Sequence, residues 1–195
     1  MVFLSSKVLQ AIEFAAVAHD HQYRKFPAKV PYISHLAAVC MVLCKSGYRE
    51  DVVAAGALHD VLEDTKLTKG EIEKNFGQEV LDLVEAVTEH KNLPWKERKE
   101  DYIKRLETAT EEAKAISGAD LLANRASNLS GLKKGVNPWL KFADNENPKD
   151  HAKKIFDIDQ KRFEMIKQNT NIPFVPELEA VMREVEELSW KLLEQ

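Results

Sequence analysis

The sequence predicts an all-α fold, because apolar residues recur at helical spacing through most of its 195 residues. Val80, Leu81, Val84 and Val87 form one such run, with the repeat of a single buried helix face. Strands would instead show a sustained alternation of apolar and polar residues, and no stretch of the sequence does. Residues that start and stop helices also stand where the periodic runs begin and end.

In chain order, the periodic runs predict helices at 5–20, 34–46, 50–63, 69–76, 78–89, 96–108, 111–130, 149–168 and 177–193. Thr68 and Glu71 have the spacing of a capping box, which marks the start of the helix at 69–76. Gly77 follows that helix as a stop signal. Pro148 and Pro176 suit the first turns of the last two helices.

Two connections are expected to be polar loops, at 23–32 and 131–147, and both are candidates to border a functional site. The length and the absence of a linker indicate one domain over 1–195, with 149–195 as a C-terminal helical extension packed on it. The last helix has the apolar face that such packing needs, made by Leu178, Val181, Met182, Val185, Leu188 and Leu192.

Composition excludes several classes of protein. Hydrophobic residues make up 44% and charged residues 31% of the chain, which is typical of a globular protein. The net charge of −4, with acidic and basic residues interleaved, argues against binding to duplex nucleic acid. No apolar run reaches membrane-spanning length and no signal peptide is evident, so a cytoplasmic protein without a membrane partner is expected. A homo-oligomer is left open.

The segment DVVAAGALHDVLEDT, residues 51–65, places polar groups after a run of small apolar residues. On a continuous helix, Glu63 lies one turn after His59, and Asp64 one turn after Asp60. Carboxylates crowded beside an apolar surface repel one another unless a cation neutralises them. A divalent metal would do so, although Glu63 and Asp64 taken alone equally fit the solvated end of a helix.

Further ligand-type residues stand elsewhere in the chain. His35 opens a helix after the residues PYIS, and Asp120 begins a polar stripe within ISGADLLANRASNL that continues with Asn124, Ser127 and Asn128. In isolation, His35 fits a buried or capping histidine and Asp120 fits a solvated acid. Together with His59 and Asp60 they favour a metal site, and mixed imidazole and carboxylate ligands suit manganese, iron, zinc or nickel.

The order His35, His59-Asp60, Asp120 resembles the H…HD…D signature of the HD-domain metal-dependent phosphohydrolases. The stretches AHDHQYRKFPAKVPYISHL, LHDVLEDT, PWKERKEDYI and SGADLLAN are further similar to small stand-alone relatives of the RelA/SpoT-type alarmone hydrolases. The resemblance runs from about residue 11 to about residue 142. It implies a compact helical bundle that removes pyrophosphate from the 3′ position of guanosine tetraphosphate.

The resemblance also implies the identity of the metal site. His35, His59, Asp60 and Asp120 match the family's metal ligands. The expected cofactor is one divalent metal, with manganese first and iron, zinc, nickel or magnesium as alternatives. Glu63 and Asp64 match the acidic pair that positions and activates the attacking water.

On the substrate side, the resemblance implies that the partner is a small phosphorylated molecule, a guanosine nucleotide. The residues that match substrate-binding positions are Arg24, Lys25, Asn124, Arg98 and Lys99. One departure from the family lies next to the predicted ligand Asp120. Several alarmone hydrolases have KLAD at this point, whereas this chain has SGAD, with Ser117 and Gly118. Two other functions stay open: an HD-family phosphomonoesterase acting on nucleoside monophosphates or other phosphoesters, and a non-catalytic nucleotide-binding sensor.

Overall fold

The structure is a computed structural model that describes residues 5–142, 147–168 and 171–194. Within them the all-α prediction is confirmed, since helices account for the fold apart from one small hairpin. The elements are α1 (Ser6–Ala18), β1 (Tyr23–Arg24), β2 (Val30–Pro31), α2 (Ile33–Lys45), α3 (Glu50–Leu58), α4 (Val61–Asp64), α5 (Lys69–Phe76), α6 (Gln78–Val87), α7 (Trp95–Thr108), α8 (Glu111–Leu132), the 3-10 helix η1 (Pro138–Phe142), α9 (Pro148–Lys167) and α10 (Val175–Leu193).

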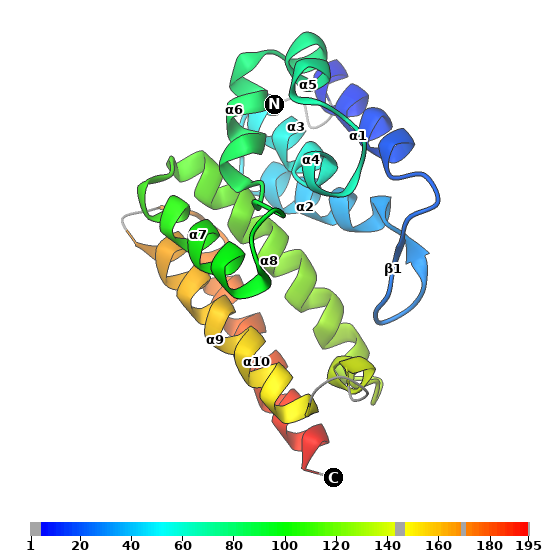
Figure 1. Cartoon of the computed structure of the whole chain (residues 1–195), viewed down its shortest axis with the longest axis vertical. Helices are drawn as coiled ribbons and strands as arrows, with labels where there is room; N and C mark the ends of the chain where they lie inside the picture. Colours follow the sequence, from blue (N-terminus) through cyan, green and yellow to red (C-terminus); the bar gives the residue numbers. More distant parts are fainter. Residues whose placement is uncertain (1–4, 143–146, 169–170, 195) are drawn as a thin grey trace.

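Helix α8 runs through the middle of the molecule and joins its two halves (Figure 1). The helices α1 to α6 gather around one part of it, while α9 and α10 pack along the other. Helix α3 is the inner helix of the first group, and Val52 through Leu58 are all buried. Its small residues allow close packing: a methyl group on Gly56 would lie 2.5 Å from the Leu43 side chain.

The predicted single helix at 50–63 is wrong, because α3 ends at Leu58 and the short helix α4 begins at Val61. His59 and Asp60 form the turn between the two helices. The imidazole Nδ1 of His59 bonds the carbonyl oxygen of Gly56 at 2.8 Å. A continuous helix would offer that carbonyl to the amide of Asp60, so the side chain competes with the helical hydrogen-bond pattern at this point.

The predicted loop at 23–32 contains a structure that was not expected, the antiparallel pair β1 and β2, with Arg24 opposite Val30. Strands of two residues are too short to show alternation in the sequence. The hairpin segment packs against the end of α8, where a methyl group on Gly131 would lie 2.4 Å from the ring of Phe26. Only a glycine allows this close approach, which holds Arg24 near α8.

The second predicted loop, at 131–147, is shorter than expected, because α8 continues to Leu132 and η1 covers Pro138–Phe142. Residues 143–146 of that loop lie outside the described residues. The predicted capping box of Thr68 and Glu71 is confirmed, as are the stop at Gly77 and the first-turn positions of the two prolines.

Along the described chain, no helix combines the length and the apolar character that crossing a membrane would require.

Candidate metal centre and active-site pocket

Three ligand-type side chains from separate helices converge on one buried point. His35 lies in the first turn of α2, His59 directly follows α3, and Asp120 lies in the middle of α8. The Nε2 atoms of His35 and His59 lie 3.0 and 3.6 Å from Oδ1 of Asp120. One ligand atom from each residue falls within 4.8 Å of the other two, which is the spacing of donors around a common ion.

Asp60 borders this cluster. Its Oδ2 atom lies 3.1 Å from Nε2 of His59 and 3.8 Å from Nε2 of His35. The same oxygen accepts a hydrogen bond of 2.6 Å from the hydroxyl of Tyr32, whose ring stacks on His19 with centroids 4.8 Å apart. The four side chains predicted as metal ligands are therefore neighbours, and the Tyr32 hydroxyl fixes the orientation of one of them.

The donor set fits a divalent cation, and His59 gives the clearest evidence. A carbonyl oxygen can only accept, so the bond to Gly56 places a proton on Nδ1 and leaves Nε2 as the ring atom that can bind a cation. That Nε2 atom is buried and has no hydrogen-bond partner among the described residues. It faces the carboxylates of Asp60 and Asp120. A positive charge is favoured between Nε2 and these carboxylates, and a metal ion bound to Nε2 would supply it in place of a proton.

The pKa shifts within the cluster also favour the binding of a cation. Burial disfavours the protonated form of His59, yet the nearby carboxylates of Asp60 and Asp120 outweigh it and hold the pKa of the imidazole well above its usual value. Burial also opposes ionisation of Asp120, but Arg162 and the two histidines hold the pKa of its carboxyl well below the usual range. The cluster thus concentrates negative charge and attracts a cation.

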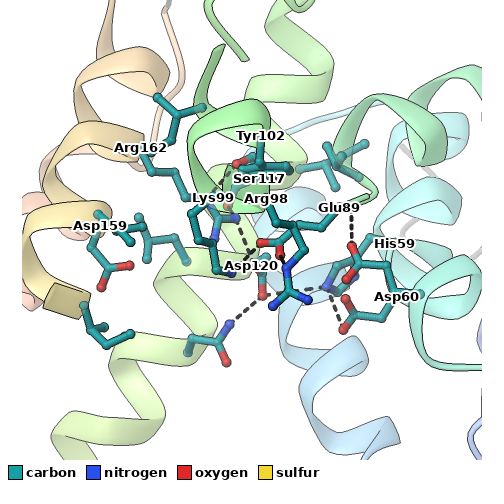
Figure 2. A pocket seen from close by; sticks show the side chains of 18 of the residues that line it. His59, Asp60, Glu89, Arg98, Lys99, Tyr102, Ser117, Asp120, Asp159 and Arg162 are labelled. Atoms are coloured by element: carbon teal, nitrogen blue, oxygen red, sulfur yellow. Dashed lines mark hydrogen bonds and ion pairs between the residues drawn. The ribbon is translucent and has the colours of Figure 1, made fainter. Parts of the chain in front are cut away.

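A cavity of 360 Å³ opens beside this cluster (Figure 2). Its wall combines the ligand-type side chains with charged and polar groups from α4, α7, α8, α9 and the segment between α6 and α7, among them Glu63, Glu89, Arg98, Lys99, Asn124 and Arg162. The size suits a phosphate group together with part of a nucleotide.

The two acids of α4 are placed differently. Glu63 lines the cavity, where its Oε1 atom accepts a hydrogen bond of 2.6 Å from the backbone N–H of Glu89. Burial raises the pKa of the Glu63 carboxyl to about 7. Asp64 does not line the cavity, and its carboxylate pairs with Lys91. Consecutive helical residues point about 100° apart, so the structure does not bring the two acids to one point.

Arg24 and Asn124 link the hairpin to the metal cluster. The Nη1 atom of Arg24 donates to Oδ1 of Asn124 at 2.9 Å, and Nδ2 of Asn124 donates to Oδ1 of Asp120 at 2.6 Å. Lys25, next to Arg24, is exposed on the hairpin segment. Asn124 and Arg24 were both predicted to contact substrate. Asn124 bonds the predicted metal ligand Asp120 directly, and Arg24 is linked to Asp120 through Asn124.

The basic element of α7 also reaches the cavity, and both of its cations bind the same acid. Arg98 Nε lies 2.9 Å and Lys99 Nζ 2.5 Å from the carboxylate of Glu89. The backbone N–H of Glu89 in turn donates a hydrogen bond to Glu63, so Glu89 links Arg98 and Lys99 to Glu63.

Sequence reasoning did not identify Tyr32, Glu89 or Arg162 as parts of this site. Arg162 lies on α9, where its Nη2 atom donates to Oδ2 of Asp120 at 2.8 Å. The sequence of α9 does contain one indication of a buried charge: Asp159 interrupts the apolar face formed by Phe156 and Phe163. That signal alone could not indicate which residue of another helix lay opposite.

The hydroxyl of Tyr32 yields a direct prediction. Tyr32→Phe keeps the stacked ring but leaves Asp60 without its donor, so Mn²⁺ affinity or turnover is expected to fall by about tenfold. Calorimetric titration with Mn²⁺ and initial rates measure the two effects. Tyr48→Phe is the matched control, because Tyr48 packs on the core and does not line the cavity. A Tyr32→Phe protein with wild-type affinity and rate would refute this role.

Both the sequence and the structure of this chain are similar to those of known proteins. The sequence profile of the HD domain matches residues 11–120. The chain is 43% identical over 119 residues to the Xenopus tropicalis protein "Guanosine-3′,5′-bis(diphosphate) 3′-pyrophosphohydrolase MESH1". The matched segment covers 60% of this chain and 66% of that protein. The human protein of the same name is 39% identical over 122 residues, covering 62% of this chain and 68% of that protein.

A solved structure titled "A metazoan ortholog of SpoT hydrolyzes ppGpp and plays a role in starvation responses" superimposes on this chain with a TM-score of 0.74. The superposition covers 98% of both chains at 27% sequence identity. The sequence match to the animal proteins spans about two thirds of their length, whereas the structural match also includes α9 and α10.

Proposed function

The chain belongs to the HD-domain family, and from that premise we propose that it is a metal-dependent phosphohydrolase acting on guanosine-3′,5′-bis(diphosphate). One observation carries the proposal: ligand atoms of His35, His59 and Asp120 from three helices lie within 4.8 Å of one another at the edge of a polar cavity. The relatives that carry this activity by name support the choice of substrate.

His35, His59, Asp60 and Asp120 would hold one divalent cation, with manganese as the proposed ion. Such a cation, when bound, supplies Lewis acidity toward a phosphoryl oxygen and lowers the pKa of a water molecule. The Asp60 and Asp120 carboxylates contribute the negative charge and the two histidines the neutral donors that fit this ion.

In the proposed reaction, a water oxygen attacks the phosphorus that is bonded to the 3′ oxygen of the ribose. The new O–P bond forms as the bond from phosphorus to the 3′ oxygen breaks, so pyrophosphate leaves and the 3′ oxygen takes up a proton. Glu63 would accept the proton from the attacking water, a role supported by its carboxylate, which lines the cavity and accepts a hydrogen bond from the N–H of Glu89.

Positive side chains would bind the charge of the substrate. Arg98 and Lys99 stand at the cavity wall, where they can offset the negative charge that spreads over the phosphoryl oxygens. Arg24 and Asn124 lie on the hairpin side of Asp120 and would orient the nucleotide, with Lys25 beside them. Asp64 would act from further away, through its ion pair with Lys91, which itself lines the cavity.

A nucleotide panel tests this function. Purified protein with Mn²⁺ is expected to release pyrophosphate from guanosine-3′,5′-bis(diphosphate), to lose that activity with a chelator, and to regain it with Mn²⁺. Guanosine 5′-diphosphate, which lacks the 3′ group, should yield no pyrophosphate. Phosphate release from nucleoside monophosphates without pyrophosphate from the tetraphosphate would indicate a phosphomonoesterase instead. Binding without any turnover would indicate a sensor.

A further inference from the structure

Arg162 reaches the metal cluster from α9, a helix that begins after the segment matched by the HD-domain profile has ended. Figure 2 shows its side chain extending from α9 toward Ser117 and Asp120 on α8. The Nη2 atom donates to Oδ2 of Asp120 at 2.8 Å, and only 14% of the Arg162 side chain is exposed. The contact is therefore a charged hydrogen bond that is largely shielded from water.

The two oxygens of Asp120 have separate partners. Oδ2 is taken by Arg162, while Oδ1 faces the Nε2 atoms of His35 and His59 and accepts from Asn124. A carboxylate without such a restraint would rotate, and either oxygen could turn to the histidines. The guanidinium removes that freedom, so a single oxygen of Asp120 is presented at the point where the ligand atoms converge.

Arg162 is itself held by a rigid set of contacts. Its Nε atom donates to Oγ of Ser117 at 2.9 Å and its Nη2 atom to the carbonyl oxygen of Ser117 at 2.5 Å. The ring of Tyr102 lies 5.3 Å from the guanidinium carbon, and the Tyr102 hydroxyl donates to the same Ser117 Oγ at 2.9 Å. A cation fixed in this way is suited to holding Asp120 and is poorly placed to turn toward a phosphate.

We propose that Arg162 is a positioning residue, which orients Asp120 for metal binding from outside the matched HD segment. The inference rests on the metal site of the proposed function. Ser117 is part of the arrangement, because a small side chain at that position leaves the space that the guanidinium fills. A lysine at position 117, on α8, would place its ammonium group where the Arg162 guanidinium lies.

The experiment measures the dissociation constant for Mn²⁺ alone by calorimetry. Arg162→Met is expected to weaken Mn²⁺ binding by about tenfold to a hundredfold, as loss of an outer partner of a metal ligand does. Adding Ser117→Lys to that variant is expected to restore binding to within about threefold, because a cation again faces Oδ2 of Asp120. Turnover of the single variant should recover in part at saturating Mn²⁺, which a purely structural defect would not allow.

Arg125→Gln is the matched control. Arg125 also joins α8 to α9 through a buried ion pair, with Nη2 2.6 Å from Oδ2 of Asp159, whereas the cation that bonds Asp120 from α9 is Arg162. This variant is expected to lower the melting temperature while Mn²⁺ affinity stays within about twofold of wild type, since the ligands keep their partners.

The outcomes separate the two proposals. Wild-type protein that fails to bind Mn²⁺ would overturn the proposed function, whereas tight binding by both the wild type and folded Arg162→Met would overturn only the role of Arg162. If Arg162→Met does not fold, Ser117→Ala decides: it keeps the buried charges and removes one acceptor of the guanidinium. A loss of about fivefold in Mn²⁺ affinity supports the role, and unchanged affinity contradicts it.

Discussion

His59→Ala is expected to abolish Mn²⁺ binding in the micromolar range and to lower the hydrolysis rate by about a thousandfold or more, the effect of losing several kcal/mol of metal-derived stabilisation. The expected effect is large because the buried Nε2 atom of His59 faces both Asp60 and Asp120. Removing it leaves the two carboxylates without the neutral donor that completes the ligand set.

Calorimetry with Mn²⁺ and the rate of pyrophosphate release measure the two effects of His59→Ala. His90→Ala is the control, because His90 is half exposed and pairs with Asp101 away from the cluster. The control should bind Mn²⁺ and turn over as the wild type does. If His59→Ala kept the wild-type rate, the ligand set proposed here would be wrong, whatever else the protein binds.

Glu63→Gln is expected to separate catalysis from metal binding. The amide has nearly the shape of the acid and its oxygen can still accept the hydrogen bond from the N–H of Glu89, but it cannot take a proton from water. A loss of about a hundredfold to ten-thousandfold in kcat is expected, as for removal of a general base. Mn²⁺ affinity should stay close to wild type, because Glu63 is not one of the clustered ligand residues.

Asp64→Asn provides the comparison for Glu63→Gln. Both acids follow the HD pair in the sequence, yet only Glu63 lines the cavity, while the carboxylate of Asp64 pairs with Lys91. Steady-state kinetics should therefore show a smaller loss of kcat for Asp64→Asn than for Glu63→Gln. The opposite order would assign the proton acceptor to Asp64.

Local features of the fold could be predicted from the sequence because their causes are local. The capping box of Thr68 and Glu71 and the glycine stop at Gly77 depend on neighbouring residues, and both are present. The break between α3 and α4 was not predicted, because the imidazole of His59 competes for a backbone carbonyl inside a run that otherwise reads as one helix. The two-residue strands were not predicted because they are too short for a period to appear.

The site was predictable only in part, for a related reason. The residue types of His59 and Asp60 by themselves indicate a pair of metal ligands. Their contact with His35 and Asp120 depends on the packing of α2, α3 and α8. Local spacing does not predict that packing, and the expectation that the four residues converge came from the family resemblance. The contact between Arg162 and Asp120 joins residues 42 positions apart. No periodicity within α9 encodes which residue of α8 lies opposite.

The most direct test of the metal centre is an anomalous-difference map from crystals grown with Mn²⁺, measured near the manganese absorption edge. One strong peak is expected among His35 Nε2, His59 Nε2 and Asp120 Oδ1, with Asp60 at its edge. A strong peak at another position in protein that hydrolyses the tetraphosphate, with none among these residues, would contradict this metal centre.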